Sequence, residues 1–276
     1  MGRLLRTKPL GATAGVLLLA MLAMALAGQW IAPYGYDEAD IFARLRPPGA
    51  THWLGTDNLG RDVLSRVIHG ARVSMTVGFG GVGLGLLGAL TVGLLSGYRG
   101  GLLDLAVQRV VDAFMCFPLL LVALTIMALL GPGLLNVILT LGLVLAVRDS
   151  RVLRGAVLGV MANPYVESAR ALGAGHGAIV RRHVLPNIVA PILILATVNL
   201  GAVILIEAAL SFLGFGVPPP RPSWGGMLST AGVVHMLRAP WLAFWPGVAL
   251  SLAVFSANML GDALRDVLDP RLRGSR

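Results

Sequence analysis

Residues 163–187 read NPYVESARALGAGHGAIVRRHVLPN and form a polar, charged island between two long apolar runs. Asn163 is a good N-cap, and Pro164 suits the first helical position because proline lacks the N–H that a helix start leaves unpaired. Gly173 can adopt the left-handed conformation that ends a helix. The pattern predicts a short helix, a reversal, and a second short helix over residues 178–185 that the following proline ends.

Two interpretations of this polar island stay open on pattern alone. Tyr165, Ala169 and Leu172 fall at i, i+4 and i+7, so they share one face of the first short helix. That face can lie on a membrane surface, as in an ordinary amphipathic loop. It can instead dock into a groove of a soluble partner, as short helices with one apolar face do.

The apolar runs around the island are long enough to cross a membrane. The chain has 276 residues, of which 56% are hydrophobic and 13% charged, and its mean hydropathy is +0.81. A helix needs about 20 residues to span the hydrocarbon core. The sequence therefore predicts an all-α integral membrane protein with six transmembrane helices, in residues 10–32, 73–97, 102–130, 134–147, 188–213 and 241–260.

Charge sets the predicted topology. Arg3, Arg6 and Lys8 precede the first apolar run, which places the N-terminus in the cytoplasm by the positive-inside rule. Six spans return the C-terminus and the island to the same side. The expected parts are cytoplasmic ends at 1–9 and 263–276, a membrane domain over 10–262, outer segments over 33–71 and 214–240, and the cytoplasmic island 163–187.

The first apolar run has an alternative interpretation. A cleaved signal peptide also has a basic start and an apolar stretch, and residues 25–27, Ala-Leu-Ala, resemble a cleavage site. Residues 10–32 are longer than a typical signal-peptide core, which favours a retained first span.

Local patterns give narrower predictions for the outer segments. A helix that starts near Asn58, capped by Thr56 or Asp57, would place its valines and Ile68 on a membrane surface, as an anchor or a lid. The proline-rich stretch 217–240 predicts a stiff loop that plugs the outer mouth or meets a protein outside. Its tryptophan, Trp224, and Trp241 suit the interfacial aromatic belt.

The second and third spans carry packing signals. Gly81 with Gly85, and Gly93 with Gly97, form GxxxG pairs, a spacing that lets helix backbones approach closely in lipid. Pro118 predicts a kink in the third span.

Particular residues of the island favour the docking interpretation. Its pattern resembles the EAA loop of ABC-transporter permeases, with Ser168 at the usual middle alanine and His183 at a usually aliphatic position. The matching residues are Glu167, Ala169, Gly173, Leu185 and Pro186. The resemblance implies a cytoplasmic coupling helix that sits in a cleft of an ATPase subunit. The docking residues implied are Tyr165, Val166, Glu167, Ser168, Ala169, Arg170, Ala171, Leu172 and Gly173.

Two further stretches resemble one branch of these permeases. Residues 52–62, HWLGTDNLGRD, and residues 207–216, EAALSFLGFG, are similar to segments of dipeptide, oligopeptide and nickel permeases. The resemblance implies the type I ABC importer permease fold and the second permease subunit of such an importer. It also implies a bacterial cytoplasmic (inner) membrane, with periplasmic outer segments.

The function that this resemblance implies is to form half of a translocation path for di- or oligopeptides by alternating access. Alternative substrates are nickel or another small solute such as glutathione or an opine. The implied partners are a second homologous permease subunit, two ATP-binding ABC subunits, an extracytoplasmic substrate-binding protein and membrane lipid.

Two polar residues stand inside the fifth predicted span. Glu207, with Asn199 two turns earlier, is costly at membrane depth and therefore suggests function. Both are predicted to lie on the translocation path. For Glu207, a hydrogen-bonded structural or cavity-lining acid is favoured over a proton carrier, which would need acidic or histidine partners that its sequence neighbourhood lacks.

Several classes of function are excluded or disfavoured. Lys8 is the only lysine and Pro9 follows it, so no Walker A loop exists and ATP with magnesium must bind partner subunits. No catalytic residue, metal site or bound cofactor is predicted. The net charge of +9 reflects arginines beside spans rather than nucleic-acid binding. A channel or an intramembrane enzyme is a remote alternative, because neither a selectivity sequence nor a histidine or lysine near Ser211 and Glu207 is found.

Overall fold

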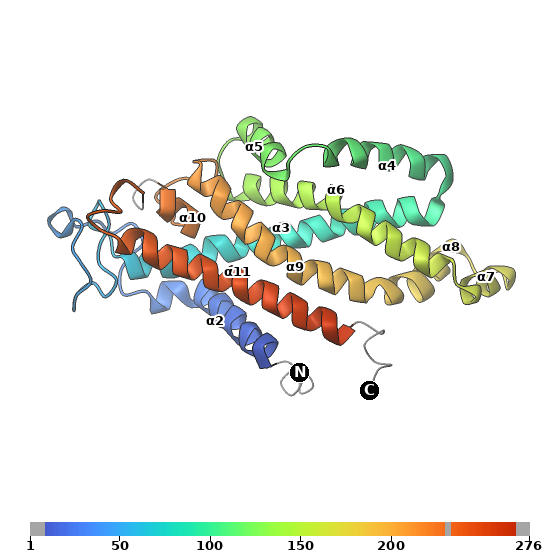
Figure 1. The fold of residues 1–276 in the computed structure, drawn as a ribbon, viewed down its shortest axis with the longest axis horizontal. Helices are drawn as coiled ribbons and strands as arrows, with labels where there is room; N and C mark the ends of the chain where they lie inside the picture. The colour runs from blue at the N-terminus through green and yellow to red at the C-terminus, as the bar shows by residue number, and fades with distance from the viewer. Residues whose placement is uncertain (1–8, 230–232, 269–276) are drawn as a thin grey trace.

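The computed structural model describes residues 9–229 and 233–268, and long helices run along the length of the molecule (Figure 1). The polar island lies at one end, and residues 32–62 lie with the short helix α10 at the other, which we call the loop end. The helices are α2 (Pro9–Ile31), η1 (Ile41–Ala43), α3 (Val63–Arg99), α4 (Gly101–Met115), α5 (Leu119–Leu130), α6 (Leu134–Met161), α7 (Pro164–Ala171), α8 (His176–Ile179), η2 (Val180–Val184), α9 (Leu185–Phe212), α10 (Trp224–Met227) and α11 (Trp241–Leu268).

The prediction of an all-helical membrane protein is confirmed, while the count of six spans stays a prediction. Among the described residues, four helices are long and apolar enough to cross a membrane: α2, α3, the run 176–212 that contains α9, and α11. The pair α4 and α5 adds a fifth if it is counted as one span. Helix α6 has 28 residues, but its second half carries Arg148, Asp149, Arg151 and Arg154.

Helix α3 is the centre of the bundle and packs against α2, α6 and α9. Its glycines lie where α6 crosses closely, as the GxxxG spacing predicted. A Cβ atom added at Gly85 would lie 2.6 Å from the Cβ of Leu145, and one at Gly93 would lie 2.8 Å from the carbonyl oxygen of Ser150. Both distances are too short for a real side chain, so these positions require glycine.

The predicted interfacial helix from Asn58 is wrong, because α3 begins at Val63 and continues without a break into the predicted second span. Asp62, not Thr56 or Asp57, is the cap, and its Oδ2 accepts a hydrogen bond from the Ser65 backbone N–H at 2.8 Å. Asp57 instead closes the preceding turn by accepting from two backbone N–H groups. Ile68, expected on a membrane surface, is buried in the core.

The third predicted span is broken rather than kinked at Pro118. Helices α4 and α5 meet at an angle of 91°. Proline lacks the N–H for a helical hydrogen bond, and its ring disfavours the helical conformation at Phe117. The chain therefore leaves α4 at Met115 and starts α5 in a new direction at Leu119.

The prediction that Pro186 ends the second short helix of the island is also wrong. Helix α8, the π-helical turn η2 and α9 follow each other directly, and Pro186 is the second residue of α9. In the π turn, the Leu185 N–H donates to the carbonyl of Val180, five residues back. This shifted pattern accommodates a residue without an N–H, so the helix continues into the membrane.

Trp224 does not lie in an interfacial belt. It is fully buried, and its Nε1 donates to the Val67 carbonyl at 3.0 Å. Its neighbour Gly225 lies so close to α9 that a Cβ atom would come within 2.4 Å of Ala208 Cα. This part of the predicted outer loop therefore folds back onto the bundle. Trp241 is partly buried, and its Nε1 donates to the Thr56 carbonyl at 3.2 Å.

Candidate functional site

The first short helix of the polar island, α7, forms where local signals predicted it. Asn163 has the extended backbone of an N-cap and Pro164 is the first helical residue. The Asn163 side chain, however, donates backward to the carbonyls of Gly159 and Val160, at 2.9 and 3.0 Å. It therefore joins α6 to α7 rather than capping α7. Gly173 has φ +84°, and the helix stops just before it as predicted.

Two sides of α7 differ in exposure. Leu172 is 88% exposed and Tyr165 43% exposed, while Ala169 is half-buried between them. Val166 is fully buried. Of the nine residues predicted to dock, Glu167, Ser168, Arg170, Ala171 and Gly173 are also exposed. The side chain of Val166 faces the protein and is therefore not available to a partner in this conformation.

Val166 anchors the island to the ends of the long helices. It belongs to a small core that also contains Val157 and Val160 of α6, Ile179 of α8 and Val184 of η2. This core is separate from the large core in the middle of the molecule. The island therefore packs as a unit on the ends of α6 and α9.

Polar contacts connect the island to α3 as well. The Tyr98 hydroxyl lies 2.8 Å from His176 Nδ1, and the Arg170 guanidinium carbon lies 6.0 Å from the centroid of the Tyr98 ring. Tyr98 is in the last turn of α3. A force on the exposed face of α7 would thus reach α3, α6 and α9 together.

Two ion pairs hold α4 against α6 near the island. Arg154 Nε donates to Asp104 at 2.6 Å, and the same guanidinium also contacts the second oxygen of this carboxylate. A second ion pair between the same two helices joins Arg151 to Asp112. The first pair is half-buried and bidentate, whereas the second is more exposed.

We predict that Asp104→Asn lowers the midpoint of thermal unfolding in detergent more than Asp112→Asn does. A bidentate, charge-assisted contact is worth about 1–2 kcal/mol, or about 2–8 °C in a chain of this size. An exposed pair contributes about 0–1 kcal/mol. Equal shifts for the two variants would contradict the assignment of α4 anchoring to Asp104 and Arg154.

Glu207 lies inside the protein between α3 and α9. Its side chain is completely buried, Oε2 accepts from Ser74 Oγ at 3.1 Å, and Oε1 accepts from Ser211 Oγ at 2.7 Å. Asn199 is also buried, and its Nδ2 donates to Asp149 Oδ2 of α6 at 2.5 Å. Each residue thus joins α9 to another helix.

The two predicted path residues are not brought together. They lie eight residues apart on α9, which corresponds to about 12 Å along the helix axis. Both side chains are buried, with Glu207 at 0% and Asn199 at 5% exposure. Their geometry is that of interhelical hydrogen bonds, which are worth about 0.6–2 kcal/mol in membranes.

The sequence reasoning missed the partners Ser74 and Asp149. Ser74 is one small polar residue in a glycine-rich span, and 133 residues separate it from Glu207. Asp149 stands among arginines, and this charged group was taken only to mark the predicted cytoplasmic end of the fourth span. An acid inside a span needs a hydrogen-bonding partner, but sequence does not say which helix provides it.

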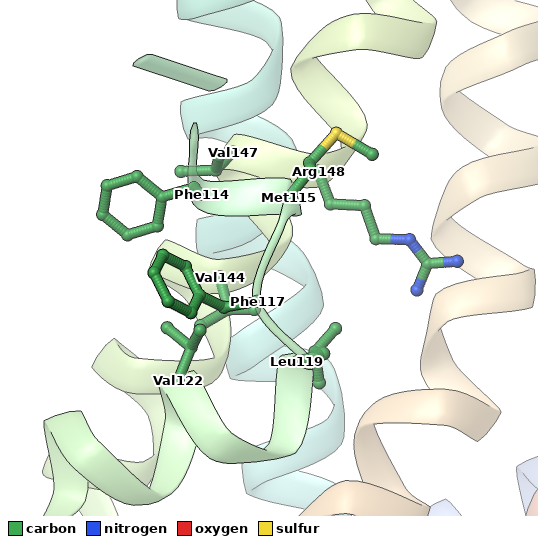
Figure 2. A pocket seen from close by; sticks show the side chains of 8 residues that line it. All are labelled: Phe114, Met115, Phe117, Leu119, Val122, Val144, Val147 and Arg148. Carbon is green, nitrogen blue, oxygen red and sulfur yellow. The ribbon is translucent and has the colours of Figure 1, made fainter. Parts of the chain in front are cut away.

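A pocket of about 200 Å³ lies at the break between α4 and α5 (Figure 2). It is lined by Phe114, Met115, Phe117, Leu119, Val122, Val144, Val147 and Arg148. Figure 2 shows the two phenyl rings on one side and the Arg148 guanidinium extending to the other. Arg148 forms no ion pair with any residue in the described ranges, so this apolar pocket has a free cation at its rim.

Comparisons with known proteins match nearly the whole chain. A family model described as "Binding-protein-dependent transport system inner membrane component" matches residues 89–274. A second, described as "N-terminal TM domain of oligopeptide transport permease C", matches residues 1–48.

Similar curated proteins are named as transport permeases. The dipeptide transport system permease protein DppC of Alkalihalophilus pseudofirmus is 38% identical over 258 residues, which cover 94% of this chain and 84% of the relative. The glutathione transport system permease protein GsiD of Pectobacterium atrosepticum is 39% identical over 94% of this chain and 86% of the relative. The di/tripeptide transport system permease protein DppC of Pseudomonas aeruginosa is 39% identical over 96% and 89%.

Proposed function

Because the chain belongs to the family of inner membrane components of binding-protein-dependent transport systems, we propose that it is a permease subunit of an ATP-driven importer of di- and oligopeptides. The observation that carries the proposal is the similarity, over more than nine-tenths of the chain, to permeases named for dipeptide and di/tripeptide transport. A permease of this family is a transport subunit and not a catalytic enzyme.

The exposed face of α7 is the proposed docking surface for an ATPase subunit. Tyr165 and Leu172 present apolar groups to solvent at the tip of the molecule, where a cleft could receive them. When ATP draws two ATPase subunits together, α7 would move with its cleft. The contacts of Val166 and Tyr98 would carry this motion to α6 and α3, and η2 would carry it to α9.

In this proposal the chain supplies half of a path, so a second homologous permease subunit completes it. The other partners are two ATP-binding subunits, which hold ATP and magnesium, and an extracytoplasmic binding protein that delivers the peptide. The membrane is the bacterial inner membrane. The polar island, with Arg170, Arg181 and Arg182, and both chain termini face the cytoplasm, in keeping with the positive-inside rule. The loop end faces outward.

Within the membrane, we assign Glu207 and Asn199 to helix packing beside the path. The carboxylate of Glu207 has a hydroxyl donor on each oxygen and no solvent exposure. A proton carrier must exchange its proton with water or with a relay of titratable groups. The hydrogen-bonding partners of Glu207 are serines, Ser74 of α3, Ser211 of α9 and Ser223 before α10, and none of them is a titratable relay group.

We expect Glu207→Gln to fold and to transport peptide at the wild-type rate between about pH 5 and 8. The amide keeps one acceptor oxygen, and a serine hydroxyl can rotate to accept from its NH₂ group. The measurement is uptake of labelled peptide into proteoliposomes across this range. Glu207→Leu is the control that removes both hydrogen bonds and should lower thermal stability. A rate that loses its pH dependence in the glutamine variant would favour a proton carrier.

Glutathione is the second candidate substrate, because permeases named for glutathione transport are as similar to this chain as those named for peptides. Glutathione and the di- or oligopeptides of the first proposal are all peptides with free carboxylates. The test is to purify this subunit from its native membrane, identify the co-purifying proteins, and identify the ligand on the binding protein. Two ATPases and a sister permease, with uptake of a dipeptide in the reconstituted complex, would support the proposal. A complex that takes up only nickel or an opine would contradict it.

A further inference from the structure

A polar cavity of about 450 Å³ lies at the loop end of the molecule. Its walls come from the turn before α3, from the end of α9 and from the proline-rich loop that follows it. The lining includes Asp57, Arg61, Arg66, Ser211, Arg221 and Ser223. Its volume falls in the range of about 300–1,000 Å³ that is common for small-ligand pockets.

The lining of this cavity carries excess positive charge. Arg61, Arg66 and Arg221 give three positive charges and Asp57 gives one negative charge, so the net charge is +2. Asp57 Oδ2 lies 2.7 Å from Arg61 Nε and 3.5 Å from Arg66 Nε. Asp37 acts electrostatically on Arg66 but does not line the cavity. The single carboxylate of the lining thus pairs with two guanidinium groups, and the third guanidinium of the lining has no carboxylate beside it in the lining.

Arg221 is that third group. It is exposed and forms no ion pair within the part of the chain that the structure describes. Prolines flank it at positions 218–220 and at 222, and their fixed φ angles restrict the main chain that carries it. It also lines a neighbouring pocket with His69 and Arg72. The guanidinium is therefore held at a cationic rim without an internal counter-ion.

We infer that this cavity binds the C-terminal carboxylate of a peptide on its way into the transporter, with Arg221 as the main contact. The inference rests on the proposed function and specifies its substrate as a peptide with a free carboxylate. A guanidinium matches a carboxylate through two parallel N–H···O bonds. At the floor, Ser211 Oγ donates to Glu207 and keeps lone pairs that can accept from a peptide N–H.

The depth of the cavity favours a peptide over other anions. Ser211 and Ser223 are 6% and 1% exposed, so they form the buried part of the lining, whereas Arg221 is exposed. A ligand that reaches both levels must extend inward past the guanidinium and carry further polar groups, as a peptide backbone does. The phosphate of a lipid headgroup, or a carboxylate on the surface of a partner protein, would stop at the rim.

The test compares one fluorine-labelled tripeptide as the free acid and as the C-terminal amide. Each is titrated into the complete transporter in nanodiscs, without binding protein, and ¹⁹F line broadening gives the Kd. Loss of a charge-assisted contact should weaken binding of the acid to Arg221→Gln by about tenfold and leave the amide unchanged. Arg221→Lys keeps the positive charge but not the planar guanidinium that makes two parallel hydrogen bonds. Its Kd for the acid should therefore lie between those of wild type and Arg221→Gln. Arg238→Gln, an exposed arginine outside the lining, is the matched control.

Three results would overturn the inference. The first is a Kd for the acid that Arg221→Gln does not change. The second is equal weakening of acid and amide, which would assign Arg221 to local structure or to a protein contact. The third is an Arg221 effect seen only in nanodiscs with anionic lipid, which would assign the site to a headgroup. Failure of the proposed function looks different: the wild-type transporter with its binding protein would take up no peptide at all.

Discussion

Replacing Leu172 by aspartate should abolish peptide uptake while the subunit still folds and inserts. Leu172 is 88% exposed in this chain, so the substitution removes almost no internal contact. In the cleft of an ATPase the same position would be buried, and an unpaired carboxylate there is strongly unfavourable. Central apolar contacts of an interface are commonly worth about 2 kcal/mol or more, which is about thirtyfold in affinity.

The measurement is paired ATPase and uptake assays on reconstituted transporter, with the midpoint of thermal unfolding as the check on folding. We expect the Leu172→Asp midpoint to equal that of wild type and ATP hydrolysis to become independent of peptide. Leu172→Met is the matched control, because it keeps an apolar side chain of similar volume and should transport normally. Normal uptake by the aspartate variant would rule out α7 as the docking surface.

The sequence predicted α7 well because its signals are local. Pro164 and Gly173 fix where the helix starts and stops, within ten positions along the chain. The second half of the island was less predictable, since Pro186 stops an α-helix but is accommodated after a π turn. Which residue anchors α7 was also beyond the pattern: Val166, next to the predicted apolar face, enters a core formed by residues of α6, α8 and η2.

Contacts between distant helices were the part that sequence did not determine. Glu207 was predicted to need special surroundings, but its donor Ser74 lies 133 residues away and gives no signal of its own. Trp224 was predicted to lie in the interfacial aromatic belt because tryptophans are enriched at membrane interfaces. Its burial depends on Gly225 lying flat against Ala208, a tertiary contact that no local pattern reports.

The glycines of α3 give the second large expected effect. Gly93→Ala should destabilise the subunit, because the new Cβ would lie 2.8 Å from the Ser150 carbonyl oxygen and 2.9 Å from the Arg154 nitrogen. Both atoms belong to the backbone of α6, so the whole helix must move. Such overpacking costs about 1–3 kcal/mol. The expected result is a fall of about 2–12 °C in the unfolding midpoint in detergent.

Gly83→Ala separates this packing effect from the intrinsic effect of alanine in a helix. Gly83 lies on the same helix, and a Cβ there would meet nothing within 4 Å. Alanine is the better helix former, so this variant should be as stable as wild type or more stable. Gly93→Ala should also reduce uptake, because α6 continues from Arg154 to Met161 and then directly to α7. If the two alanine variants unfold at the same temperature, the close approach of α3 and α6 at Gly93 is wrong.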